Sequence, residues 1–197
     1  MKTVVLICDE IGADYLNRVK AYLSDVAEVW FPDRPVSNSV QLLDQLQSEV
    51  LRRQPEVVHI GASLGDTRCV CCGSEERLIP LNFYETNVKR ILRLIQERST
   101  AEVIWGTIPP VYEEHFEPNP DDGESVSYRN DVIMEYNEKA REIVKAAAGG
   151  RVHLNDLYGA VKAASREDSW RPNGLKFCDR GVELLARKIE KSVRARL

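Results

Sequence analysis

The run Thr3-Val4-Val5-Leu6-Ile7-Cys8, followed at once by Asp9 and Glu10, decides the fold class of this chain. Six uncharged residues, mostly apolar, are typical of a strand buried on both faces, as strands are in a parallel sheet. Similar short apolar runs occur further along the chain, at 27–31, 56–60, 101–105 and 152–154. A longer stretch with helical character follows each run, so the pattern predicts a parallel sheet covered by helices on both faces.

The segments between the strands carry apolar residues at the spacing of amphipathic helices. The predicted helices span 13–26, about 38–53, 82–97, 129–148 and 156–164, with a last helix beginning at Asp179. Asn38 or Ser39 is expected to cap the second helix, Gly149-Gly150 to end the fourth, and Asp179 to cap the last. No internal repeat and no low-complexity tract interrupts the pattern, so residues 1–197 are predicted to form one domain.

Composition narrows the classes of function. The 197 residues are 43% hydrophobic and 29% charged, with a net charge of −4. A slightly acidic chain argues against nucleic-acid partners and anionic membrane surfaces, which favour basic proteins. No apolar run approaches the roughly 18 residues of a membrane span. We therefore expect a cytoplasmic protein with no membrane partner, and composition gives no basis for an oligomeric state.

Ligands of open parallel sheets bind beyond the carboxyl ends of the strands. The segments predicted to reach that edge are 8–12, 32–38, 61–80, 106–127 and 166–178. Two of them are far longer than an ordinary connection, and long loops of this kind are usually functional. The sequence therefore predicts a site at this edge.

Three short blocks along the chain resemble those of SGNH (GDSL-type) hydrolases in order and spacing. They are Cys8-Asp9-Glu10-Ile11, Gly61-Ala62-Ser63-Leu64-Gly65-Asp66, and Asn173-Gly174-Leu175-Lys176-Phe177 with the following Asp179-Arg180-Gly181-Val182. The resemblance covers nearly the whole chain. It implies a three-layer α/β/α sandwich, flavodoxin-like, with a five-stranded parallel sheet, and an ancestral activity on esters.

The family's reactive positions are substituted in this chain. The resemblance places a serine nucleophile at Glu10, the triad aspartate at Asn173 and the triad histidine at Lys176. The backbone glycine of the oxyanion hole falls near Ser37-Asn38, where no glycine exists. The oxyanion asparagine, aligned against Asp66, falls at Gly65. The three histidines are His59, His115 and His153, none of them in the last block, so a serine triad is not expected.

The substituted positions allow two interpretations. Family geometry would bring Glu10 and Lys176 together, either as a reactive carboxylate beside an ammonium or as a buried salt bridge that fills the former pocket. Asp66 could take part in rewired chemistry, or it could cap a loop as aspartates often do. Ser63 with Lys176 is a weaker nucleophile–base pair. The residues expected to contact a small ligand are Asp9, Ser37, Asn38, Ser63, Gly65 and Asn173.

Five cysteines are present, and Cys69, Cys71 and Cys72 cluster in one predicted loop. Thiolates bind zinc, but this spacing is closer than the two to four residues usual between zinc ligands. An odd number of cysteines in a reducing compartment favours free thiols. We therefore expect no cofactor and only a weak candidate metal site.

Three hypotheses follow from these observations. The first is an SGNH-like domain that has lost ester hydrolysis and keeps a pocket for a small molecule or a partner. The second is an active hydrolase or acyltransferase, acting on small esters or acetylated sugars, that uses Glu10, Asp66 and Lys176 in new roles. The third is a thiol or metal protein built on the cysteine loop.

Overall fold

The computed structural model describes residues 1–61, 63–69, 76–115, 128–147, 149–164, 170–171 and 174–197. Its centre is a five-stranded, fully parallel sheet, as predicted. The strands are β1 (Lys2–Cys8), β2 (Ala27–Trp30), β3 (Val57–Gly61), β4 (Glu102–Gly106) and β5 (Val152–Asn155), in the order β2-β1-β3-β4-β5. This is the strand order of flavodoxin-like folds.

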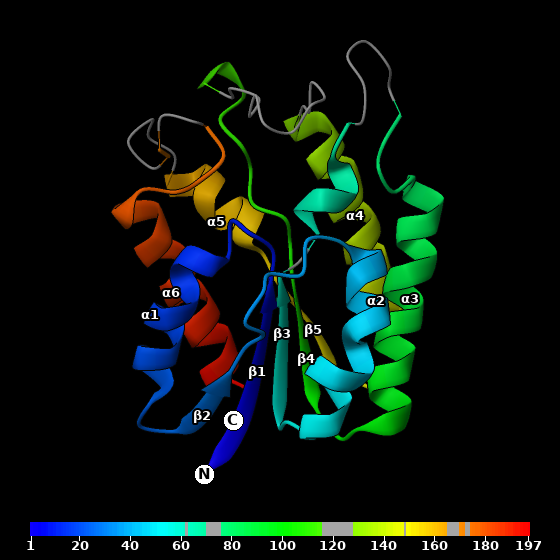
Figure 1. Cartoon of the computed structure of the whole chain (residues 1–197), viewed down its shortest axis with the longest axis vertical. Helices are drawn as coiled ribbons and strands as arrows, with labels where there is room; N and C mark the ends of the chain where they lie inside the picture. The colour runs from blue at the N-terminus through cyan, green and yellow to red at the C-terminus, as the bar shows by residue number, and fades with distance from the viewer. Residues whose placement is uncertain (62, 70–75, 116–127, 148, 165–169, 172–173) are drawn as a thin grey trace.

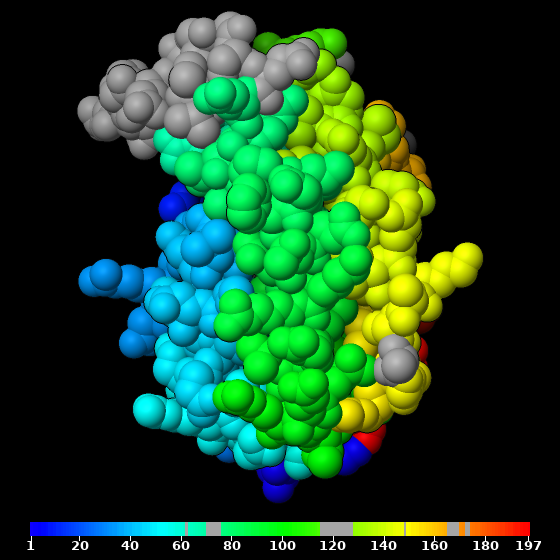
Figure 2. Space-filling view, turned by 90° about the vertical axis from the view of Figure 1, so that its right-hand side faces the viewer, coloured from blue at the N-terminus to red at the C-terminus, as the bar shows by residue number. Residues whose placement is uncertain are grey.

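Helices cover both faces of the sheet and complete the three-layer sandwich (Figure 1). One face carries α1 (Ala13–Leu23), α5 (Leu157–Ala164) and α6 (Asp179–Arg194), and the other carries α2 (Ser39–Glu49), α3 (Leu81–Arg98) and α4 (Asn130–Ala146). Figure 2 looks onto the second face, where α3 lies between α2 and α4. Single 3₁₀ turns occur at Leu51–Arg53, Leu64–Thr67 and Glu113–His115.

The central strands form the middle of the hydrophobic core. Val4, Val5, Val57 and Val58 have no exposed surface, because helices cover both faces of β1 and β3. Continuous apolar strands are stable only in this environment, which explains why the runs of β1 and β3 lack the alternation of a half-exposed strand. Trp105 of β4 is 1% exposed and belongs to this core.

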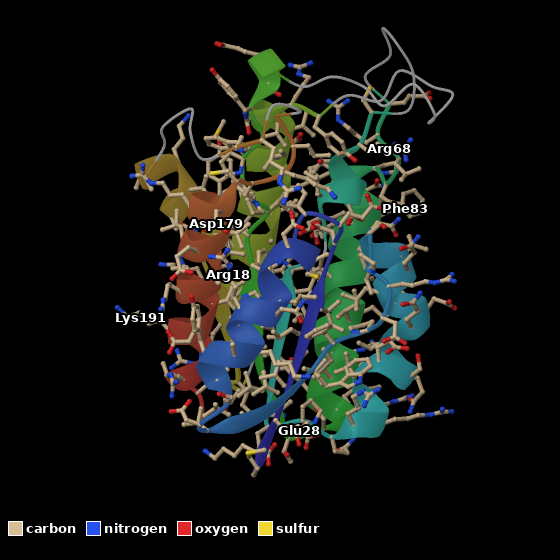
Figure 3. All side chains as sticks on the ribbon, turned by 60° about the vertical axis from the view of Figure 1, so that its left-hand side comes forward. Arg18, Glu28, Arg68, Phe83, Asp179 and Lys191 are labelled. Atoms are coloured by element: carbon tan, nitrogen blue, oxygen red, sulfur yellow. The ribbon has the colours of Figure 1, made fainter. Side chains whose placement is uncertain are left out.

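The carboxyl ends of all five strands point to the same end of the molecule (upper end in Figure 1). From β1 the chain turns back to β2 on one side, whereas β3 lies on the other side of β1. The connections that follow β1 and β3 therefore diverge, and such a divergence opens a crevice suited to ligands. In Figure 3, Arg68 lies toward this end of the sheet and Glu28 toward the opposite end.

Helix boundaries differ from the sequence expectation at three carboxyl ends. The predicted helix over 13–26 ends at Leu23. The predicted helix over 38–53 ends at Glu49, with Val50 as its C-cap, and a separate 3₁₀ turn follows at Leu51–Arg53. The predicted helix over 129–148 ends at Ala146, before Gly149 and Gly150, which adopt φ values of 87° and 68°.

The two predicted helix caps have different outcomes. Asn38 caps α2 as expected: its side-chain oxygen accepts hydrogen bonds from the backbone N–H groups of Val40 and Gln41. The cap predicted at Asp179 is wrong, because the backbone of Cys178 is extended and Asp179 is already the first helical residue. The carboxylate of Asp179 instead pairs with Arg18 of α1 (Figure 3).

None of the helices within the described ranges combines the length and apolarity needed to cross a membrane.

Candidate functional site

The turn between β1 and α1 is organised around the carboxylate of Asp9. Its Oδ1 accepts the backbone N–H groups of Ile11 at 3.1 Å and Gly12 at 3.2 Å. Gly12 is required here, because a Cβ at this position would overlap the Cβ of Cys8. The turn therefore has a fixed shape that does not depend on the side chain of Glu10, which is exposed at its tip.

Asp9 also joins this turn to the segment after β3. Its Oδ2 accepts the backbone N–H of Leu64 at 3.2 Å, and the residue is only 6% exposed. Burial raises the pKa of Asp9 to about 6, and the N–H donors around it partly oppose that rise. With both oxygens engaged by backbone donors, Asp9 stabilises the site, and its predicted contact with a ligand stays a prediction.

The segment after β3 packs directly on the loop before α2. The backbone N–H of Gly65 donates to the carbonyl oxygen of Ser37 at 3.0 Å. A Cβ at Gly65 would overlap that same oxygen, so the position admits no side chain. The placement of the oxyanion asparagine at Gly65 is therefore wrong for steric reasons. The side chain of Ser63, two residues beyond β3, is buried.

Asp66 is fully buried beneath the same loops. Its two oxygens accept hydrogen bonds from the backbone N–H of Ser39 at 2.9 Å and from the Ser39 hydroxyl at 2.5 Å. The side chain of Asn87, on α3, donates to that hydroxyl at 3.0 Å. Burial raises the pKa of Asp66 to about 7. With no exposed surface and both oxygens bonded to Ser39, the Asp66 carboxylate does not face solvent at this edge, and its predicted catalytic role stays a prediction.

Two buried hydroxyl groups lie near Asp66. Ser63 is 2% exposed and Tyr84, on α3, has no exposed surface. Within the described residues neither hydroxyl makes a hydrogen bond of acceptable geometry. They are nevertheless neighbours: burial raises the pKa of Tyr84, the Asp66 charge raises it further, and the Ser63 hydroxyl lowers it. Ser63 is therefore a buried polar residue with no base beside it in this part of the structure, unlike an activated nucleophile.

Ser37 and Asn38, the predicted ligand contacts in the loop before α2, use part of their hydrogen-bonding capacity to hold the loop and the helix. The side-chain oxygen of Asn38 is occupied by the α2 cap, and the residue is 8% exposed. Ser37 is half-buried and anchors the loop through its backbone, since its N–H donates to the side chain of Gln41 at 3.0 Å. Of this pair, Ser37 is the more exposed residue.

Lys176 lies on a short hairpin-like segment before α6. Trp170 and Phe177 form an isolated antiparallel bridge, and the backbone N–H of Arg171 donates to the carbonyl of Lys176 at 2.7 Å. The Trp170 ring packs on Phe177 and on Tyr112, at centroid distances of 5.6 and 5.8 Å. Lys176 itself is half-buried. The predicted ligand contact Asn173 lies outside the described residues.

Glu10 and Lys176 do not form the expected buried pair. Glu10 is exposed, and among the residues that the structure describes its carboxylate makes no hydrogen bond or ion pair. The interpretation in which a Glu10–Lys176 salt bridge fills the site is therefore not supported. Glu10 instead presents an open negative charge at the end of β1.

The histidines on the sheet do not supply a base at this edge. His59 is 2% exposed and lies 3.1 Å from the Asn155 side chain, and burial lowers its pKa to about 4. His153 pairs with Glu102, at the start of β4, over 2.6 Å. The side chain of His115 lies outside the described part of the chain. Both described imidazoles are packed into the sheet, as their positions in strands indicate.

The cysteine cluster is only partly visible. Cys69 is buried and belongs to an isolated bridge with Arg77, whereas Cys71 and Cys72 lie outside the described residues. Cys8, at the end of β1, is buried and carries a free thiol. In the described ranges no group of three or more potential ligands could hold a metal ion.

Three residues of this edge were not anticipated from the sequence. Ser39 binds Asp66 from α2, Asn87 binds the Ser39 hydroxyl from α3, and Tyr84 of α3 lies near Asp66 and Ser63. Ser39 was expected only as an alternative helix cap, and no local pattern marks Asn87 or Tyr84, because each occupies an ordinary position on an amphipathic helix. Their role appears only when the helices pack on the sheet.

Comparison with solved structures places this architecture among esterases and lipases. A lipase/acylhydrolase from Enterococcus faecalis superposes with a TM-score of 0.77 at 24% identity, covering 100% of this chain and 97% of that one. A GDSL-like lipase from Bacteroides thetaiotaomicron gives a TM-score of 0.71 at 14% identity, covering 100% and 89%. An acetyl xylan esterase gives 0.72 at 17% identity, covering 97% and 99%.

These similarities confirm the predicted fold, which is that of GDSL-like hydrolases over the full length of the chain. At the level of sequence, neither a family model nor a curated protein matches. The shared property is thus the architecture, and the chemistry depends on the residues at the carboxyl edge.

Proposed function

We propose that this protein is a non-hydrolytic binding domain on the fold of GDSL-like hydrolases, with a small polar molecule as its ligand. The ligand contacts Glu10, Lys176 and Ser37, which belong to three segments at the carboxyl edge of the sheet. The names of the structural neighbours, which include a lipase/acylhydrolase and an acetyl xylan esterase, suggest acyl compounds and sugars as the first ligands to test.

One observation carries this proposal. Glu10 occupies the tip of the turn after β1, and in the described part of the edge no serine with an accessible side chain is hydrogen-bonded to a histidine or a carboxylate. The Ser39 hydroxyl donates to the Asp66 carboxylate, but neither residue has exposed surface. Acyl transfer through a serine needs a nucleophile and a base in hydrogen-bond contact. The remaining carboxylates do not replace that pair, because Asp9 and Asp66 are held by donors from the surrounding loops.

Binding of a ligand does not need a nucleophile and a base in contact. A turn held by Asp9 presents residue 10 rigidly, and rigid presentation reduces the entropy lost on binding. A carboxylate at Glu10 and an ammonium at Lys176 provide one acceptor group and one donor group, which suits a hydroxylated or zwitterionic molecule.

The exposure of Glu10 favours a second candidate function. An open carboxylate at the end of β1 could act as a base or a nucleophile toward small esters or acetylated sugars, with Lys176 stabilising negative charge. This hydrolase or acyltransferase would work without Asp66, which is buried.

A paired assay separates the two candidates. The wild-type protein, Glu10→Ala and Lys176→Ala are incubated with p-nitrophenyl acetate, p-nitrophenyl butyrate and acetylated xylooligosaccharides. Glu28→Ala is the matched control, because Glu28 is exposed at the opposite end of the sheet (Figure 3). We expect no turnover above buffer in any sample. Turnover that is lost in both edge variants and kept in Glu28→Ala would establish the second candidate.

Binding is measured on the same four proteins by ligand-observed NMR with xylose, acetylated xylose and short-chain carboxylic acids. We expect saturation transfer to at least one compound, reduced in Glu10→Ala and Lys176→Ala and unchanged in Glu28→Ala. Equal signals in all four proteins, or no signal in any, would remove the binding function.

A further inference from the structure

We propose that a cavity beside the Glu10 turn holds a short aliphatic chain, about four carbons long, of the molecule that binds at this edge. This inference rests on the proposed binding function and names the class of ligand more closely: a polar head with a short apolar tail.

The cavity lies between the start of α1 and the loop that follows β2. Cys8 and Leu16, which are 4% and 6% exposed, form its buried walls. Ala13, Phe31 and Pro32 also line it, and the exposed residues Asp33, Arg34 and Pro35 form its rim. Cys8 and Ala13 flank the turn that carries Glu10, so the cavity adjoins that turn.

The backbone keeps this cavity in place. The N–H of Val36 donates to the carbonyl oxygen of Cys8 at 2.8 Å, which ties the loop after β2 to the end of β1. Val36 has no exposed surface, so the loop is anchored in the core just beyond the rim. The walls are therefore preformed, as is usual for small-molecule sites.

The size of the cavity limits its occupant. Its volume is about 110 Å³. An engineered apolar cavity of about 150 Å³ stays dry and binds benzene, a six-carbon molecule. By proportion, the cavity beside α1 takes about four carbons.

The chemistry of the walls favours an apolar occupant. Burial raises the pKa of the Cys8 thiol, and the neighbouring Asp9 charge raises it further, so Cys8 stays neutral and behaves as a small hydrophobic group. Leu16, Phe31 and Pro32 add aliphatic and aromatic surface. The tail of a ligand would thus gain the free energy of removing apolar surface from water.

The rim indicates where the polar head lies. Asp33 and Arg34 are exposed, and in the described structure neither side chain forms an ion pair. They give the mouth charges of both signs, as a polar or zwitterionic head requires. A ligand with a tail in the cavity would carry its head to the same edge as Glu10.

The cavity can be tested alone with uncharged probes. The 1-alkanols from ethanol to hexanol are titrated into ¹⁵N-labelled wild-type protein, and amide shifts are followed. We expect shifts at residues 13, 16 and 31, and an affinity that increases about fourfold for each added methylene, as expected for burial of one CH₂. The increase should stop after butanol. Absence of shifts at these residues, or a continuous increase through hexanol, would overturn the proposal.

Two variants of α1 provide the matched comparison. Ala13→Leu adds bulk at the cavity wall, and Asn17→Leu adds the same side chain at an exposed position of the same helix that does not line the cavity. We expect Ala13→Leu to weaken butanol binding at least tenfold and Asn17→Leu to leave it unchanged, with both proteins folded by circular dichroism. Equal effects of the two variants would contradict the assignment.

The alkanols carry no charged head, so this titration and the Glu10 experiments fail independently. If butanol binds but Glu10→Ala has no effect on polar ligands, the proposed occupant of the cavity is supported and the proposed edge site is rejected. If Glu10→Ala loses polar-ligand binding but butanol does not bind to the protein, the proposed edge site is supported and the proposal of an aliphatic tail in the cavity is rejected.

Discussion

Asp66 and Ser39 form a buried pair in which one carboxylate accepts both the backbone N–H and the hydroxyl of a single residue, at 2.9 and 2.5 Å. Ser39 is the first residue of α2, and Asp66 lies in the 3₁₀ turn after β3. The pair therefore fixes the start of a helix to the end of a neighbouring strand connection. Burying the Asp66 carboxylate in this pair removes its hydration, which disfavours the charged form.

The desolvation of Asp66 predicts that the free energy of unfolding depends on pH. The pKa of Asp66 is about 7 in the folded protein against 3.8 ordinarily, because of burial. The folded state thus binds the proton more tightly than the unfolded state, and ionisation of Asp66 lowers the free energy of unfolding as pH rises from about 4 to about 7. The change is at most about 4 kcal/mol, since one pKa unit corresponds to about 1.4 kcal/mol.

Urea unfolding of Asp66→Asn and the wild type between pH 4 and 8 measures this effect. The difference in free energy of unfolding should shift in favour of the variant from pH 4 to 7 and then stay constant. Asp44→Asn, at an exposed position of α2, should differ from the wild type by a constant amount. A wild-type to Asp66→Asn difference that is independent of pH would show that Asp66 has an ordinary pKa.

Tyr84 and Tyr136 offer a comparison between a hydroxyl without a hydrogen bond and one with such a bond. Their rings are in contact, with centroids 5.0 Å apart, but only the Tyr136 hydroxyl has an acceptor, the carbonyl of Ile79 at 2.6 Å. Tyr136→Phe should cost about 1 kcal/mol, the usual net value of a hydrogen bond, whereas Tyr84→Phe should be neutral or stabilising. Chemical denaturation measures both. A larger loss in Tyr84→Phe would mean that its hydroxyl is satisfied in solution.

The N-cap at Asn38 is expected to stabilise α2. Asn38→Ala removes the acceptor for two N–H groups at the start of α2 and should cost about 1 kcal/mol. Asn38→Asp keeps a side-chain oxygen in the same place and should restore most of the stability. Thermal unfolding in parallel distinguishes the two. Equal destabilisation by both substitutions would indicate that the amide nitrogen of Asn38, not its oxygen, matters.

Position 10 tests whether the edge can still perform ester chemistry. Glu10→Ser alone should give no turnover of p-nitrophenyl acetate, because a serine without a base is not activated. Glu10→Ser combined with Asn173→Asp and Lys176→His should exceed the single variant by at least about 100-fold, the lower range for general-base catalysis. Labelling of position 10 by a fluorophosphonate, detected by mass spectrometry, provides the second readout. Labelling of the single variant to the same extent would show that another base already serves this position.

Much of the fold could be predicted from the sequence, because it depends on local patterns. The apolar run ending at Cys8 and the periodicity of the six helices correspond to β1 and α1–α6 within a few residues. The N-cap at Asn38 followed from residue type and position alone. These features are short-range, so one segment contains the information for each.

The site was predictable in location but not in detail. The connections after β1 and β3 do lie together, but the burial of Asp66 depends on Ser39, 27 residues away, and Gly65 is excluded from a side-chain role by the backbone of Ser37. The expected Glu10–Lys176 pair assumed family geometry, whereas the Glu10 side chain points to solvent. Contacts of this kind depend on how separate segments pack, which periodicity does not encode.

The support that Asp9 gives to its turn has an evolutionary consequence. The bonds that shape this turn run from a carboxylate to the N–H groups of Ile11, Gly12 and Leu64, and none involves the side chain at position 10. Substitution at position 10 therefore leaves the folding free energy almost untouched while changing what the edge can do. Selection can exchange one activity for another at this point through single codon changes, with the scaffold inherited intact.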